Sequence, residues 1–147
     1  MSVVVTEDVR RRAEVYEGDE ICQEKLKEML KEICLPNGLL PLKDIHECGY
    51  HRDNGFFWLK QNKSYTHKFH KLGKQVSYAP EVTGYAQKGK ITKITGVKSK
   101  QLMIWITVSD IYVDDPSTDK ITFQVPTGQS KQYPISAFHI EEDTKEI

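Results

Sequence analysis

The sequence has 147 residues, of which 38% are hydrophobic and 29% charged, and its formal net charge is zero. This length and composition are typical of one soluble globular domain. The zero net charge argues against a dedicated nucleic-acid-binding protein, which usually carries a strongly basic domain. No apolar stretch approaches the roughly 18 residues that a membrane-spanning helix needs.

The N-terminal run and the cysteines bear on the cellular compartment. The stretch MSVVV is too short for the apolar region of a signal peptide. Cys22, Cys34 and Cys48 are an odd number of cysteines without a CxxC pair, which suits a reducing compartment. We therefore expect a cytoplasmic protein, and peripheral association with a membrane is compatible with that expectation.

Charge is distributed unevenly along the chain. Residues 33–105 contain twelve Lys and Arg against four Asp and Glu, whereas residues 1–32 contain six against nine, and residues 106–147 three against eight. Such a basic block is either a solvated face or a site for an anionic partner.

Two helices are predicted at the start of the chain. The first covers residues 7–17, with Thr6 as its N-cap and Gly18 at its end. The second covers residues 20–33 with Asp19 as its cap, and its apolar stripe consists of Cys22, Leu26, Met29, Leu30 and Ile33. We expect residues 1–18 to form a loosely attached helical extension and the second helix to cover a face of the sheet that follows.

The segment 35–42, LPNGLLPL, combines four leucines with turn residues and carries no charge. Gly38 is expected at positive φ as the helix C-cap. Two interpretations stay open for the leucine side chains. They pack as a plug over one end of the sheet, or they form an apolar ligand gate; the residues concerned are Leu35, Leu39, Leu40 and Leu42.

From residue 44 onward, short β-branched and aromatic runs alternate with turns. Strands are predicted near residues 45–50, 55–60, 65–70, 75–86, 91–96, 101–113, 120–125 and 132–138. The fold class is therefore mainly β (α+β by content), an antiparallel meander curled into a barrel-like sheet and preceded by one or two N-terminal helices. Residues 19–140 would form this single domain, and residues 141–147 an acidic disordered tail.

A four-residue hairpin loop at QNKS would pair Lys60 with Tyr65. One face of that hairpin would then carry an inward-facing aromatic set, namely Phe56, Trp58, Tyr65, His67 and Phe69. The same register buries most rings of FFWLKQNKSYTHKF, which argues against a base-stacking surface for nucleic acid.

Lysines concentrate in the predicted turns. In a strict meander consecutive turns alternate ends, so HRDN, KLGK, VKSK and PTGQSK would share one end. That end would be basic and would bind anionic headgroups through Arg52, Lys71, Lys74, Lys98, Lys100 and Lys131. The simpler interpretation is that charged turns keep strand edges soluble.

Sequence motifs for catalysis and metal binding are weak. The segment HECGYH contains His46, Cys48 and His51, but no second pair has zinc-finger spacing. No nucleophile elbow, zinc-protease motif or phosphate loop occurs. We therefore assign no catalytic residue, no metal and no cofactor; a hydrolase would need Ser109 or Ser136 beside His67 or His139 in a cleft.

Several segments in order, LPNGLLPL, WLKQNKSYTHKF, GKITKITGVKSKQLMIW, IYVDD, PTG and YPISAF, resemble the plant family known as domain of unknown function 538. The resemblance covers about residues 20–139, and the N-terminal piece resembles the shorter cytosolic branch. It implies a small β-rich, barrel-like domain preceded by a helix, and roles in growth or stress responses. It also implies similarity to lipid-binding proteins, and a chlorophyll-ester hydrolase activity has been suggested for the family.

Together these features favour a non-enzymatic plant protein that binds lipid or an anionic membrane surface, with a small apolar ligand as a further candidate. The alternatives are an esterase-type hydrolase acting on a chlorophyll or lipid ester, and a protein–protein scaffold. The oligomeric state and the physiological role do not follow from the residues.

Overall fold

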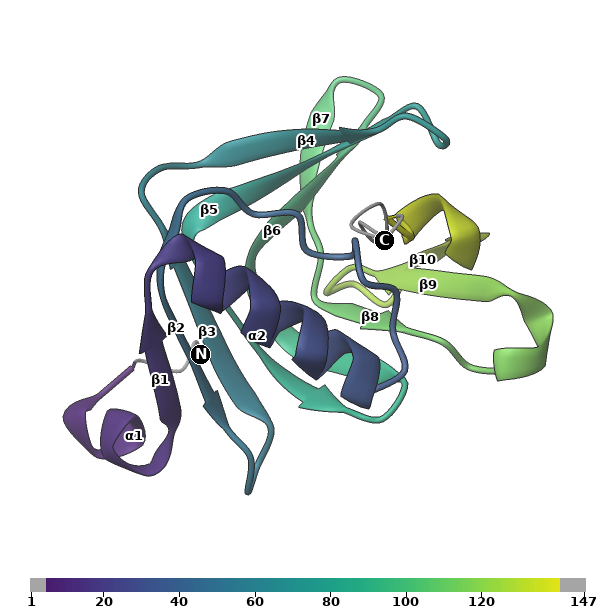
Figure 1. Ribbon diagram of the computed structural model, residues 1–147. Coiled ribbons are helices and arrows are strands. Elements are labelled where there is room, and N and C mark those ends of the chain that lie inside the picture. The colour runs from purple at the N-terminus through teal and green to yellow at the C-terminus, as the bar shows by residue number, and fades with distance from the viewer. Residues whose placement is uncertain (1–4, 141–147) are drawn as a thin grey trace, which may run out of the picture.

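A computed structural model describes residues 5–140. The chain forms one antiparallel ten-stranded sheet that curls around a core without closing, and the helix α2 (Asp19–Glu32) lies across it (Figure 1). The predicted fold class is confirmed. The tail 141–147 lies outside the described residues.

The remaining elements follow one another closely. They are α1 (Glu7–Arg12), β1 (Glu14–Glu17), β2 (Ile45–His51), β3 (Phe56–Gln61), β4 (Tyr65–Phe69), β5 (Lys74–Gln87), β6 (Lys90–Gln101), β7 (Ile104–Thr107), β8 (Asp110–Tyr112), η1 (Pro116–Thr118), β9 (Lys120–Gln124), β10 (Ser130–Pro134) and η2 (Ile135–Phe138).

The sheet is not a strict meander, because the two long strands β5 and β6 each pair with two partners on one side. The order is β1-β2-β3-β5-β6-β8-β9-β10, while β4 pairs with the first half of β5 and β7 with the last residues of β6. Lys60 therefore lies opposite Glu47 and Glu81, and Tyr65 lies opposite Tyr78. The predicted pairing of Lys60 with Tyr65 is wrong.

The bend that lets β5 change partner requires a glycine on β6. The β5–β6 register shifts on both sides of Thr83. Gly96 has a φ of +84°, and a Cβ there would lie 2.4 Å from the Glu81 carbonyl oxygen. Only glycine fits such a close approach of two backbones.

The predicted first helix is correct only in its first half. Thr6 caps α1 by accepting a hydrogen bond from the Val9 N–H at 3.2 Å, but α1 ends at Arg12. Residues 14–17 form β1, which pairs with β2. So short a helix gains little stability by itself, whereas pairing with β2 satisfies backbone groups along that strand. Residues 5–17 are therefore attached to the sheet rather than loosely associated with it.

The apolar side chains of α2 and of the leucine segment 35–42 are buried in the core as predicted, but the residues at the two ends of α2 differ from the predicted caps. The α2 stripe is buried, and Leu35, Leu39, Leu40 and Leu42 are 6%, 1%, 4% and 3% exposed. Gly18 rather than Asp19 is the N-cap, and the Asp19 carboxylate accepts the Ile45 N–H at 2.9 Å. Cys34 rather than Gly38 adopts positive φ after the helix.

Gly38 is needed for a different reason from the predicted one. Its N–H donates to the Phe138 carbonyl at 2.9 Å, and a Cβ would lie 2.5 Å from that oxygen. The leucine segment is thereby held against the C-terminal η2.

Strand β3 is buried on both faces, which a hairpin with one inward face does not explain. Phe56 and Trp58 are buried as predicted, but so are the alternating Phe57 and Leu59. Of the other predicted ring residues, Phe69 is buried, whereas Tyr65 and His67 are only partly buried. The Trp58 indole N–H donates at 2.8 Å to Glu47, which also pairs with Arg10 of α1. The N-terminal segment thus helps to cover the outer face of β3.

Candidate functional site

The β6–β7 hairpin carries four of the five large hydrophobic side chains that are exposed among residues 5–140. Leu102 is 94% exposed, Met103 84%, Ile104 65% and Trp105 39%, and the other large exposed hydrophobic side chain among residues 5–140 is Ile140. Strand β7 pairs only with β6, so the hairpin stands at the rim of the sheet (Figure 1). Four consecutive exposed apolar residues are unusual unless they bind something.

The turn of this hairpin departs from ordinary turn chemistry. Leu102 has a φ of +58°, a conformation that tight hairpin turns normally give to Gly, Asn or Asp. A leucine there is strained by about 1–2 kcal/mol, and at 94% exposure it recovers nothing from packing. Residues that break a local rule without structural compensation are expected at functional sites.

A groove of about 700 Å³ lies beside the hairpin, between the β6–β7 strands and the β9–β10 turn. Its apolar lining comes from Ile106, Val108, Phe123 and Val125, and its polar lining includes Gln101 and Lys131. Aromatic rings pack beneath it. Phe123 stacks on Phe138 with ring centroids 5.3 Å apart, and it contacts the Tyr133 ring edge-on with centroids 5.5 Å apart. The groove therefore has an apolar wall on a firm aromatic base.

Five of the six predicted basic residues gather around this hairpin. Lys74 donates to the Lys100 carbonyl at 3.3 Å, and Lys131 donates to the Gln101 side chain at 3.0 Å. Lys98 and Lys100 lie on the same face of β6, and Lys71 occupies the turn before β5. Within residues 5–140 none of these five lysines forms an ion pair.

The segments that supply this lysine cluster are poor in carboxylates. No Asp or Glu occurs in residues 54–80, 82–109 or 120–140. These residues include the β4–β5 turn, the β6–β7 hairpin and β10. Burial and repulsion from Lys131 lower the pKa of Lys74. The positive charges at this end are therefore compensated by no side chain of those segments.

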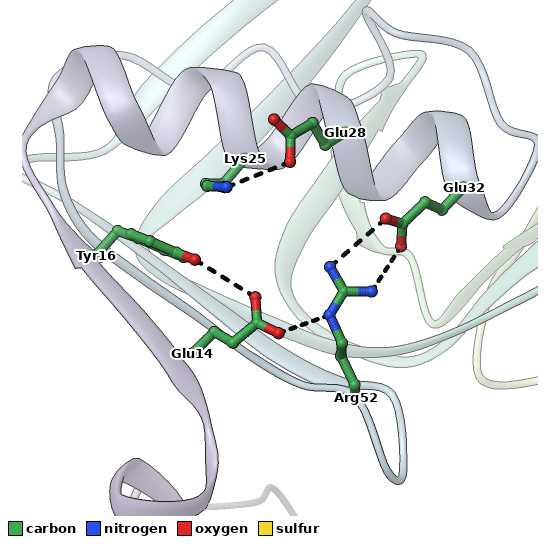
Figure 2. Close-up of polar contacts among 6 residues, drawn as sticks. All are labelled: Glu14, Tyr16, Lys25, Glu28, Glu32 and Arg52. Carbon is green, nitrogen blue, oxygen red and sulfur yellow. Dashed lines mark hydrogen bonds and ion pairs between the residues drawn. The ribbon is translucent and has the colours of Figure 1, made fainter.

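Arg52 lies elsewhere. The β2–β3 turn that carries it lies next to the end of β5, where the Ala86 N–H donates to Gly55, at the opposite end of β6 from the hairpin. Arg52 donates to Glu32 at 3.0 Å and to Glu14 at 2.6 Å, and these bonds raise its pKa (Figure 2). It links α2, β1 and the β2–β3 turn.

The prediction that Arg52 shares the basic end is wrong because it assumed a strict meander and a turn at VKSK. Residues 97–100 lie inside β6, and the chain reverses at Leu102 and Met103 instead. The pairing of β3 with β5 breaks the alternation of turns as well. The other five residues nevertheless lie at one end of the molecule, because the β4–β5 turn and the β6–β7 hairpin lie at the same end of the β5–β6 pair.

The leucine segment takes no part in this groove. None of Leu35, Leu39, Leu40 and Leu42 lines it, and all four belong to the main core. Their burial fits the plug interpretation.

The residues considered for hydrolysis are not brought together. The Ser109 hydroxyl donates to the Gln124 carbonyl at 3.2 Å, and the His67 ring contacts the Tyr65 hydroxyl at 3.4 Å. In residues 5–140 no serine hydroxyl is hydrogen-bonded to a histidine ring. Ser136 and His139 are joined only through their backbones.

The zinc interpretation of HECGYH finds no constellation either. Cys48 is buried, and burial raises the pKa of its thiol, while His46 is exposed. The part of the chain that the structure describes contains no group of three or more His, Cys, Asp or Glu side chains that would hold a metal ion. It also contains no helix that is long and apolar enough to cross a membrane.

Sequence reasoning missed the most exposed part of the site. The sequence pattern predicts one strand over residues 101–113, although QLMIW places four apolar residues in a row shortly after KSK. That run of apolar residues next to lysines was the available signal. The groove residues Phe123 and Tyr133 gave none, because only tertiary packing brings β9 and β10 beside the hairpin.

Comparison with known proteins places most of the chain in one family. A family model described as "Protein of unknown function, DUF538" matches residues 26–139. An uncharacterised protein of Arabidopsis thaliana is 29% identical over 119 residues, which are 81% of this chain and 65% of that protein's length. No solved structure matches.

Proposed function

Since the chain belongs to the DUF538 family, whose description assigns no function, we propose from its surface that it binds anionic membranes reversibly. The observation that carries this proposal is the apolar tip Leu102–Trp105, which stands exposed among five lysines. The tip would enter the boundary between headgroups and acyl chains, and the lysines would contact anionic headgroups. The location that follows is cytoplasmic and peripheral to a membrane. A role in growth or stress responses stays part of the proposal on the family resemblance alone.

An electrostatic and an apolar contribution support binding. Each lysine near an anionic surface contributes about 1 kcal/mol. Each apolar side chain of the tip contributes at most about 1.5–3 kcal/mol when it leaves water. The loss of free motion on binding costs about 4–15 kcal/mol and opposes both contributions. Their combination gives the two-signal, reversible attachment known for peripheral proteins.

The side-chain types also suit a membrane boundary. Trp105 is amphipathic, and the Lys100 ammonium lies 5.7 Å from its ring centroid. Tryptophan and lysine are both favoured where one end of a side chain is apolar and the other meets headgroups. An ordinary soluble hairpin tip would instead carry polar turn residues.

The test is co-sedimentation with phosphatidylcholine vesicles with and without phosphatidylserine. The tip variant Leu102→Asn/Met103→Ser should lose binding while its unfolding free energy holds or rises, since asparagine relieves the strain at residue 102. The charge variant Lys98→Glu/Lys100→Glu should lose binding as well. The matched control Lys63→Glu/Lys88→Glu, which changes exposed lysines elsewhere, should bind like the wild type.

Added salt should weaken the wild-type interaction, because exposed charges are screened within about 10 Å at 0.1 M. Undiminished sedimentation of the tip variant, or an equal loss in the control, would contradict the proposal. A wild-type protein that ignores anionic vesicles would also contradict it, and the apolar tip would then suit the scaffold alternative better.

A further inference from the structure

We infer that the groove beside the β6–β7 hairpin binds one acyl chain that carries an anionic headgroup. The ligand would be a monoacyl anion, with its chain between β7 and the β9–β10 turn and its headgroup at Lys131 and Lys74. This inference rests on the proposed function, because the membrane under the hairpin would supply the ligand.

The groove has the size and lining of a small-molecule site. Its volume of about 700 Å³ lies inside the range of roughly 300–1,000 Å³ that is usual for such sites. Ile106 and Val108 form one wall, and Val125 and Pro126 lie on the opposite turn. A few polar groups along a mostly apolar wall fix a ligand's orientation without covering the apolar surface.

Charge selects the headgroup. The Lys131 ammonium lies at the groove and donates to the neutral Gln101 side chain rather than to a carboxylate. Repulsion between Lys131 and Lys74 adds to burial in lowering the pKa of Lys74. A carboxylate or phosphate placed between them would relieve that repulsion and form charge-assisted hydrogen bonds. A neutral headgroup would leave the repulsion in place and accept only weaker hydrogen bonds from the two ammonium groups.

The position of the groove explains how a chain would reach it. Gln101 and Ile106, which line the groove, belong to the same hairpin as the exposed tip. If Leu102 and Met103 enter the acyl boundary, the groove opens at headgroup depth. A lipid chain would then pass from the membrane into an apolar wall without crossing bulk water.

The floor of the groove is built to stay in shape. Phe138 is 2% exposed and Phe123 8% exposed, and their rings stack at 5.3 Å. Phe69 also packs on Phe138, with the two ring centroids 4.8 Å apart. A preformed wall loses little entropy when a flexible chain binds.

The experiment uses the full chain and three monomeric probes below their micelle concentrations. These probes are palmitate, 1-palmitoyl-lysophosphatidic acid and the uncharged 1-monopalmitoylglycerol. Native mass spectrometry measures stoichiometry, and displacement of a fluorescent fatty acid measures affinity. We expect one bound molecule of each anionic probe and at least about tenfold weaker binding of the neutral one, since charged hydrogen bonds contribute roughly 1.5–3 kcal/mol. The two anionic probes distinguish a carboxylate from a phosphate site.

Three variants change the groove in different ways. Val125→Glu makes its wall charged, Thr127→Trp fills it with an uncharged ring, and Lys131→Met removes one of the two headgroup contacts. All three side chains are partly or fully exposed, so thermal unfolding should stay near that of the wild type. We expect the first two to abolish binding of every probe. The third should reduce the preference for anionic probes without removing it, because Lys74 remains. Lys63→Glu is the control.

The outcomes separate this inference from the proposed function. The tip variant Leu102→Asn/Met103→Ser should still bind monomeric palmitate while it loses vesicles. Wild-type protein that sediments with anionic vesicles but binds no monomeric probe would overturn the groove inference and leave the proposed function standing. Probe binding that survives both Val125→Glu and Thr127→Trp would overturn the groove as well. Probe binding without vesicle binding would overturn the proposed function, and with it the membrane as source.

Discussion

Replacing Glu47 tests how the N-terminal segment is attached. The Glu47 side chain is only 12% exposed, and its carboxylate accepts the Trp58 indole N–H at 2.8 Å and pairs with Arg10 and Lys60. Trp58 is fully buried, so Glu47→Ala leaves an unpaired indole N–H, which costs about 1–3 kcal/mol. Glu47→Gln keeps an oxygen acceptor and should cost less.

The pH dependence follows from the same contacts. Burial raises the pKa of Glu47, but the hydrogen bonds from Arg10 and Trp58 outweigh burial, and the pKa is lowered overall from its usual 4.5. A carboxylate with a lowered pKa stabilises the fold above its unfolded-state pKa and loses that effect as the pH falls through the folded-state pKa. The stability gap between wild type and Glu47→Gln should therefore be present at pH 7 and close in acid.

Urea unfolding at a series of pH values, followed by tryptophan fluorescence and circular dichroism, measures this gap. Glu24→Gln, on the exposed side of α2, is the matched control and should track the wild type throughout. A gap that is absent at pH 7, or that keeps its size in acid, would refute the reasoning.

Three further predictions separate structural from functional residues. Arg52→Ala should lower the unfolding free energy by less than about 1 kcal/mol, because both ion pairs of Arg52 are exposed to solvent. It should leave vesicle sedimentation unchanged, whereas a headgroup-binding role for Arg52 would require a loss. Leu39→Ala should lower the unfolding free energy by about 2–5 kcal/mol and leave palmitate binding intact. Weakened palmitate binding in a folded variant would instead support the interpretation of the leucine segment as a ligand gate. In native protein at pH 8, iodoacetamide should label the exposed Cys34 and spare the buried Cys22 and Cys48, as peptide mass spectrometry would show; rapid labelling of Cys48 would contradict its burial and raised thiol pKa.

Much of the fold follows from local patterns in the sequence. The apolar stripe of α2 repeats at helical spacing, and it is buried where that spacing places it. The four leucines of 35–42 are buried because a loop with no polar side chains apart from Asn37 cannot face water at low cost. Strand positions followed from β-branched runs between turns, and most of their boundaries agree with the structure within a few residues.

The errors arose where partners far apart in the chain decide the outcome. Residues 14–17 fit a helix by spacing, and only the neighbouring β2 makes them a strand. Whether β3 pairs with β4 or β5 depends on the length of β5 and on a bend at Gly96, which the sequence does not announce. The pairing of β3 with β5 places Arg52 at the opposite end of the sheet from the lysines.

The sequence by itself determined the composition of the site: lysines without carboxylates over long stretches, and an apolar run after KSK. Tertiary structure alone decided that Leu102 and Met103 form an exposed turn, and that β9 and β10 close a groove beside it. The physical reason is that charge and hydrophobicity belong to each residue, whereas exposure depends on which strands find each other. The sequence of an apolar run is the same whether the sheet buries its side chains or leaves them exposed to water.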